Sequence, residues 1–238
     1  MKLILSSVLL LSAFFANAQR VIDVNKVDES PFRGLFYVVG GNPFSMAKYA
    51  KVTEGSPFFK DEWMKGSVIV KSGDQYDNQL LRLDLISNEL HYLDSTGQEM
   101  ITTEKVVEVI LKDTLSGKQY RFVYSSAIAV PKSERPVTGW YQLLSMGSAN
   151  LFCKFQKEIV DTRPYGAATY DETIKTTSLY FLAYKEIFYR IKKIKDVPDI
   201  LTDKRTELNN YINSKDLSGK SESDYKNLIE YYNSLQTK

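Results

Sequence analysis

Hydrophobic and polar residues alternate along most of the chain in short runs that turn residues separate. In "VVEVILK", for example, Val107, Val109 and Leu111 share one face of the predicted strand. Short runs joined by tight turns are typical of antiparallel strands. No helix-length segment separates them, as a parallel sheet would require. We predict strands at 67–71, 80–86, 89–93, 106–112, 118–124, 139–145, 150–159, 178–184 and 187–194.

The pattern changes to helical spacing near Asp196. Ser221 and Asp224 resemble a capping box at the start of a helix. The apolar stripe that follows is Tyr225, Leu228, Ile229, Tyr232 and Leu235. Because helices this short do not stand alone, we expect two of them to pack on each other and on the β-rich body. The polar stretch 160–175 predicts a long loop, and the Gly pair in "VVGGNPF" (38–44) predicts a turn.

These elements predict a mainly β (α+β) fold. We expect an antiparallel β-meander, as a sandwich or a partly open barrel, with a small C-terminal helical unit. The β-rich body spans 19–195 and forms one or two β subdomains. In the second case they divide near the connector "PKSERP" (131–136). The C-terminal two-helix unit spans 196–238.

The N-terminus predicts export. Lys2 precedes an apolar run, "LILSSVLLLSAFFA", which ends in "ANA". These features indicate a secretory signal peptide over 1–18 with cleavage after Ala18. The run is short for a membrane anchor, and no Cys stands near the cleavage point, so we do not expect a lipoprotein. We expect the mature protein in the periplasm or outside the cell, with no later membrane-spanning segment.

Charge and cysteine content narrow the function classes. Removing the leader takes Lys2 from the 31 basic residues and none of the 29 acidic ones. A nearly neutral chain gives no electrostatic reason to expect nucleic acid as a partner. The one cysteine excludes an internal disulfide, so the exported chain needs a substantial apolar core.

Most catalytic and cofactor chemistries lack their residues. A structural zinc site needs four nitrogen or sulfur ligands, but the chain has one histidine, His91, and Cys153. Cys153 alternates with Leu151 and Phe155, which indicates a core thiol. His91 is in phase with Glu89, which we interpret as a surface strand face. We therefore predict no catalytic residues, no metal site and no cofactor.

Carboxylates leave one enzymatic alternative open. A glycosidase needs only two of them. Asp61 and Glu62 are adjacent and would point opposite ways in an extended segment. Asp84 is in phase with Arg82, which we interpret as a surface ion pair. The turn "DSTGQE" (94–99) lacks the acidic positions of a calcium loop.

The basic run 185–195 alternates with Ile187, Tyr189 and Ile191. We interpret it as a solvated edge of the sheet, where lysines discourage strand addition.

Aromatic residues give the candidate site. The chain holds 16 Tyr, 12 Phe and 2 Trp, and most of them suit β-sheet cores. Phe58, Phe59 and Trp63 differ, because they follow a Gly-Ser-Pro turn rather than lie in an alternating strand. They are the candidate contact residues for a ligand or partner. The structural alternative is that they anchor an ordered corner, with Gly55 and Pro57 setting its backbone.

Three segments carry a resemblance. "KYAKVTEGSPFFKDEWMKGSVIVKSGD", "LLRLDLISNEL" and "DYKNLIEYYNSL" resemble a set of exported Bacteroidetes proteins with no assigned function. The resemblance implies an envelope location and brings no catalytic residue, cofactor or ligand. We therefore expect a non-catalytic binding or assembly component of the cell envelope, with an envelope protein or glycan as partner. The alternative is a carboxylate-based hydrolase that acts on an envelope or extracellular polymer.

Overall fold

The computed structural model of the chain describes residues 21–23, 41–43, 49–130, 136–163 and 170–236. The predicted signal peptide (1–18) and most of the connector 131–136 lie outside these residues. No helix in the described part of the chain is long and apolar enough to cross a membrane.

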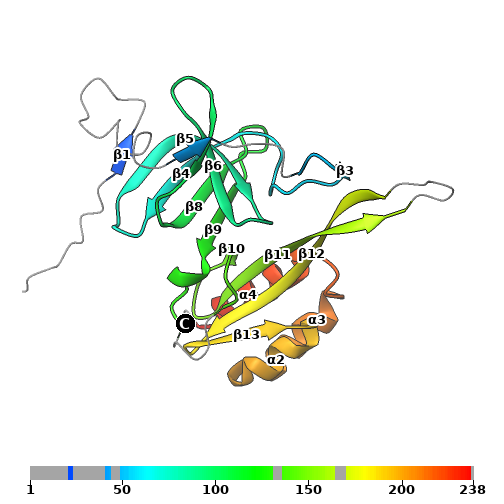
Figure 1. Ribbon diagram of the computed structural model, residues 1–238. Helices are drawn as coiled ribbons and strands as arrows, with labels where there is room; N and C mark the ends of the chain where they lie inside the picture. The colour runs from blue at the N-terminus through cyan, green and yellow to red at the C-terminus, as the bar shows by residue number, and fades with distance from the viewer. Residues whose placement is uncertain (1–20, 24–40, 44–48, 131–135, 164–169, 237–238) are drawn as a thin grey trace, which may run out of the picture.

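The fold is mainly β, as predicted, with helices at the C-terminus (Figure 1). The strands are β1 (Val21–Asp23), β2 (Gly41–Pro43), β3 (Val52–Glu54), β4 (Met64–Val70), β5 (Gln75–Asp84), β6 (Glu89–Leu93), β7 (Glu99–Thr102), β8 (Val106–Lys112), β9 (Gln119–Tyr124), β10 (Trp140–Ser145), β11 (Asn150–Thr162), β12 (Asp171–Tyr184) and β13 (Ile187–Ile191). The helices are α2 (Val197–Ile200), α3 (Arg205–Ser214) and α4 (Glu222–Gln236).

One continuous, mostly antiparallel sheet joins all the strands. Its order is β13-β12-β11-β10-β9-β8-β4-β5-β6-β7-β2. Two short strands pair in parallel, β1 with β5 and β3 with β12. β9 precedes the predicted connector and β10 follows it, and the two strands pair with each other, so one sheet includes strands from both sides of the connector.

The sheet coils in its N-terminal half, which comprises β4 to β9. The Trp140 Nε1–H at the start of β10 donates to the Asn88 carbonyl at 3.1 Å. These residues lie far apart in the strand order, so the bond joins two sides of the coiled sheet. The interior holds an apolar core of Met64, Val68, Val70, Tyr76, Leu81, Leu83, Leu85, Leu90, Tyr92, Val106, Val109, Leu111, Tyr120, Phe122 and Trp140.

The C-terminal half comprises β10 to β13 and the helices. Its core includes Leu151 and Leu182 from the sheet and Leu208, Leu228 and Ile229 from the helices, all fully buried. Asn233 joins α4 to the β10–β11 turn, since it accepts from Ala149 N–H and donates to Ala149 O. The expected packing of the helices on the sheet is confirmed, as is the cap, where Ser221 Oγ accepts from Asp224 N–H at 3.2 Å.

Two local predictions are wrong. The expected loop 160–175 is wrong at both ends, because residues 160–162 belong to β11 and residues 171–175 to β12, and the two strands pair from Asn150↔Ala183 out to Thr162↔Asp171. Among the described residues of this outer hairpin Ile174 is buried and the others are half-buried or exposed, so its polar sequence shows no apolar alternation. The expected turn at 38–44 is wrong over Gly41–Pro43, which forms β2 beside β7. The interpretation of the basic run is confirmed: β13 is a sheet edge, and Lys185, Arg190, Lys192, Lys193 and Lys195 are exposed.

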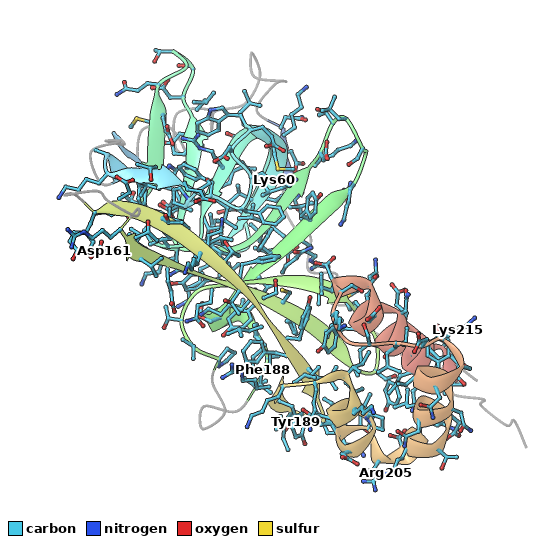
Figure 2. The ribbon with its side chains drawn as sticks, turned by 90° about the vertical axis from the view of Figure 1, so that its right-hand side faces the viewer. Lys60, Asp161, Phe188, Tyr189, Arg205 and Lys215 are labelled. Atoms are coloured by element: carbon cyan, nitrogen blue, oxygen red, sulfur yellow. The ribbon has the colours of Figure 1, made fainter. Side chains whose placement is uncertain are left out.

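Figure 2 shows the long β11–β12 hairpin running from beside the N-terminal half to the helices. Asp161 lies at the end beside the N-terminal half, and Phe188 and Tyr189 lie at the other end, near the helices. The hairpin therefore contacts both halves.

Candidate functional site

The segment 55–63, here called the strap, extends the coiled sheet beyond the start of β4. Phe59 N–H donates to Leu83 O at 2.8 Å, and Leu85 N–H donates to Pro57 O at 2.9 Å. A strand-like segment sends successive side chains to opposite faces. Phe58 and Phe59 therefore face opposite sides of the sheet.

The three candidate aromatics occupy different environments. Phe59 packs on the interior core, with its ring centroid 4.9 Å from Tyr120 and 4.8 Å from Phe122. Phe58 is 3% exposed and lies on the outer face, edge-on to His91. Trp63 is half-buried. That these rings contact a ligand stays a prediction. Their packing contacts within the protein are those expected of the structural alternative, an ordered corner.

The strap covers a row of charged residues on the outer face of β5, β6 and β7. The register pairs Arg82 with His91 and Asp84 with Glu89, so their side chains share one face. The Arg82 guanidinium stacks 3.8 Å from the Phe58 ring centroid and 4.7 Å from that of Trp63. The opposite face of the same strands carries core residues Leu81, Leu83, Leu90 and Tyr92.

This row corrects two interpretations made from the sequence. His91 is not a surface residue, since it is fully buried. Asp84 is also fully buried and is not the ion-pair partner of Arg82. Arg82 Nη2 instead binds both carboxylate oxygens of Glu99, at 2.7 and 2.8 Å. The strap covers the outer face of the sheet here. Asp84 and His91 on that face are therefore buried, although their sequence alternates as in a strand whose polar face is exposed.

Hydrogen bonds hold the buried groups of the row. His91 Nδ1 lies 2.6 Å from Glu99 Oε1. The Tyr49 hydroxyl donates to Asp84 Oδ2 at 2.5 Å, and the N–H groups of Ile86 and Ser87 donate to Asp84 Oδ1. Desolvation of the buried hydroxyl, followed by its hydrogen bond to the Asp84 carboxylate, raises the pKa of Tyr49 far above its ordinary value.

The strap is also tied to the β11–β12 hairpin. The Lys157 ammonium donates to Ser56 O at 2.8 Å and to Phe58 O at 2.6 Å. Desolvation lowers the pKa of Lys157, and the nearby Asp61 and Asp84 oppose that effect. The strap therefore bridges the charged row and the hairpin.

A pocket of about 790 Å³ opens between the two sides of the coiled sheet. Its wall combines the aromatic residues Tyr124 and Trp140 with the amide residue Asn88 and with charged residues such as Glu89 and Lys105. The lining residues are Lys71, Asn88, Glu89, Leu90, Thr102, Glu104, Lys105, Val106, Val107, Tyr124, Ser126, Ala127 and Trp140.

The pocket has one rigid aromatic wall and one charged rim. Tyr124 is half-buried and packs edge-on against Trp140, with ring centroids 5.0 Å apart. Trp140 is 4% exposed, and its Nε1–H is bonded to Asn88 O. Lys71, Glu104 and Lys105 are exposed at the rim. The arrangement offers a ring face together with donors and acceptors, which suits a polar ligand.

Glu89 connects the pocket and the charged row. It lines the pocket and also lies beside Asp84 and His91, with ligand atoms of the three residues within 4.8 Å of one another. The alternation of polar and apolar residues in "LLRLDLISNELHY" places four polar residues on one strand face: Arg82, Asp84, Glu89 and His91. From the sequence we interpreted this face as exposed to solvent. Glu99 and the pocket residues Tyr124 and Trp140 carried no such signal.

Cys153 takes no part in either feature. It is fully buried in β11, which confirms the interpretation as a core thiol. Burial, with a further contribution from Glu222, raises the pKa of this thiol to about 12. A thiol held in the neutral form is a poor nucleophile.

No protein-family model matches the chain, and no curated protein or solved structure matches it either.

Proposed function

We propose that this chain is an exported, non-catalytic binding protein that holds a small glycan of the cell envelope in the pocket between β6, β8 and β10. The leader predicted at 1–18 and the resemblance to exported Bacteroidetes proteins support the location. The binding role rests on the pocket.

The pocket wall is the observation that carries the proposal. A sugar ring has an apolar face and a rim of hydroxyl groups, so its site needs an aromatic surface beside hydrogen-bonding side chains. The half-buried Tyr124 provides the aromatic surface, and its contact with Trp140 holds the ring in place. Lys105 provides hydrogen-bond donors, Glu104 provides acceptors, and the Asn88 amide provides both. The volume of about 790 Å³ lies within the range of small-ligand sites.

Calorimetric titration with chitotriose and with soluble peptidoglycan fragments tests the proposal. We expect one of these glycans to bind at a single site. Tyr124→Ala should weaken that binding about tenfold or more, because a central aromatic contact is worth more than about 1 kcal/mol. Lys105→Met, at an exposed position, should also weaken it without affecting the fold.

Tyr170→Ala is the matched control, since Tyr170 is 63% exposed and outside the pocket. Unchanged affinity in both pocket variants, or equal loss in the control, would overturn the proposal. Absence of glycan binding by the wild-type protein would do the same.

One observation favours the hydrolase alternative: Glu89 and Glu104 both line the pocket. Glycosidases place two carboxylates around the bond that they cleave. Incubation of the same glycans with wild-type protein and Glu104→Gln separates the two functions. Intact glycan supports the binding protein, whereas products that the variant fails to release would establish the hydrolase.

A further inference from the structure

Three residues of the charged row have the composition of a metal-binding site. Asp84, Glu89 and His91 each offer one ligand atom, and these atoms lie within 4.8 Å of one another. Asp84 ends β5 and pairs with Glu89 on the neighbouring β6, which also carries His91. The ligands therefore come from a rigid strand pair.

The orientation of His91 suits metal coordination. A metal-bound histidine almost always donates its other ring N–H to a carboxylate or carbonyl. Here Nδ1 lies 2.6 Å from Glu99 Oε1, and a carboxylate only accepts, so Nδ1 carries the proton. Arg82 holds Glu99 through two hydrogen bonds. In the neutral imidazole, the lone pair is then on Nε2, on the side of Glu89.

The distance between two of the ligand atoms is close to that of a metal site. His91 Nε2 lies 3.9 Å from Glu89 Oε2, while two ligands of one tetrahedral zinc ion lie about 3.3 Å apart. The Glu89 side chain is 37% exposed, so it has room to move toward the imidazole. Asp84 and His91 are fully buried, and the bonds from Tyr49, Ile86 and Ser87 hold the Asp84 carboxylate in place.

A bound cation would add positive charge at a place where carboxylates gather. Three carboxylates meet in this row, those of Asp84, Glu89 and Glu99, and Arg82 binds the third. Lys157 is near Asp84, but its ammonium group also interacts with Asp61 and donates hydrogen bonds to two carbonyl groups of the strap. Buried like charges are costly unless an opposite charge compensates them.

We propose that Asp84, Glu89 and His91 bind a divalent transition-metal ion of the zinc type, with a coordination position left open beside Glu89. An imidazole with two carboxylates suits zinc or manganese better than calcium or magnesium, which take oxygen ligands only. The sequence expectation of no metal site assumed that several histidines were needed, whereas here carboxylates complete the set.

The test is titration of tag-free protein with zinc chloride, followed by calorimetry and by NMR of the imidazole nitrogens. The chain has one histidine, so the imidazole signal belongs to His91. We expect one zinc ion per chain and a large shift of Nε2. Glu89→Gln should weaken binding by about tenfold or more, and calcium should not compete.

Glu104→Gln is the control, because Glu104 is an exposed carboxylate that lines the pocket outside the cluster. It should bind zinc like the wild type. No binding at millimolar zinc, binding without a change at His91, or equal affinity in Glu89→Gln would overturn the proposal. The experiment uses no glycan, so its failure is distinct from failure of the proposed glycan binding.

Discussion

The two halves of the molecule use the same continuous sheet but differ in what they bury. Among the described residues, the fully buried carboxylate and imidazole, those of Asp84 and His91, lie in the N-terminal half. The buried polar residues of the C-terminal half, Gln142 and Ser145, are uncharged. Its interior is an apolar cluster between the sheet and the helices.

Both halves have an apolar core, and the N-terminal half adds a buried charged network. Burying apolar side chains stabilises a fold directly. A buried charged network is weak evidence for stability, because desolvation offsets much of the attraction. Local departures from the most stable choice are expected at functional sites. The charged row shares Glu89 with the pocket of about 790 Å³, which supports placing the proposed binding function in the N-terminal half.

Truncation in the apolar core should have the largest effect on stability. Leu228 of α4 is fully buried, so Leu228→Ala should lower the free energy of unfolding by about 3 kcal/mol through lost contacts and a cavity. Urea denaturation followed by circular dichroism measures it. Lys226→Ala, two residues away and partly exposed, should cost well under 1 kcal/mol. Similar losses in both variants would contradict an apolar core under α4.

The ion pair of the charged row should couple more strongly than an exposed pair. Arg82→Met should cost about 2 kcal/mol, because it leaves Glu99 in a partly desolvated place without its guanidinium partner. Adding Glu99→Met should recover part of that loss, and a double-mutant cycle measures the coupling. Lys226 and Glu230 on α4, 3.7 Å apart and exposed, form the control cycle, with an expected coupling of about 0.3–0.5 kcal/mol. Equal coupling energies for the Arg82–Glu99 and Lys226–Glu230 pairs would contradict the distinction between a partly buried ion pair in the N-terminal half and an exposed one in the C-terminal half.

The junction of the strap with β12 should tolerate no side chain at Gly55. Gly55 has φ +83°, and a Cβ there would lie 2.5 Å from Ile174 O. Gly55→Ala should therefore cost about 2 kcal/mol in thermal or urea unfolding. Gly97 has φ +82° with nothing within 4 Å of its Cβ position, so Gly97→Ala isolates the backbone cost of about 1 kcal/mol. If the two variants lose the same stability, the close approach to β12 is wrong.

The C-terminal half should show a small dependence on acid through Asp203. Its carboxylate accepts from Gln236, Tyr232 and Tyr184. Desolvation raises the pKa of Asp203, but these bonds and its own backbone N–H together hold it below the ordinary 3.8. Because the folded pKa is the lower one, the stabilisation is present above the unfolded pKa and is lost as pH falls through the folded pKa.

Melting temperatures of the wild type and Asp203→Asn measure this effect. The variant should melt lower at pH 7, and the two should converge at pH values below the folded pKa. A difference that persists unchanged at low pH would show that the Asp203 charge does not contribute.

The sequence predicted the fold far better than the site. Strands such as 89–93 and 106–112 were found at their observed bounds, because one face is apolar and the other polar. The outer part of the β11–β12 hairpin escaped detection because, among its described residues, Ile174 is the single buried one. The burial of His91 and Asp84 could not be predicted, because it depends on the strap, which is distant in sequence. The pocket likewise depends on the coiling that brings Trp140 to Asn88.

The most direct test of a functional N-terminal half is a map of backbone amide shifts in labelled protein during titration with the glycan fragments. The account predicts shifts that concentrate at 88–90, 102–107, Tyr124 and Trp140, with the helices unchanged. Shifts confined to the smaller pocket of about 390 Å³ beside Arg190, Lys220 and Tyr225, or to α3 and α4, would contradict it.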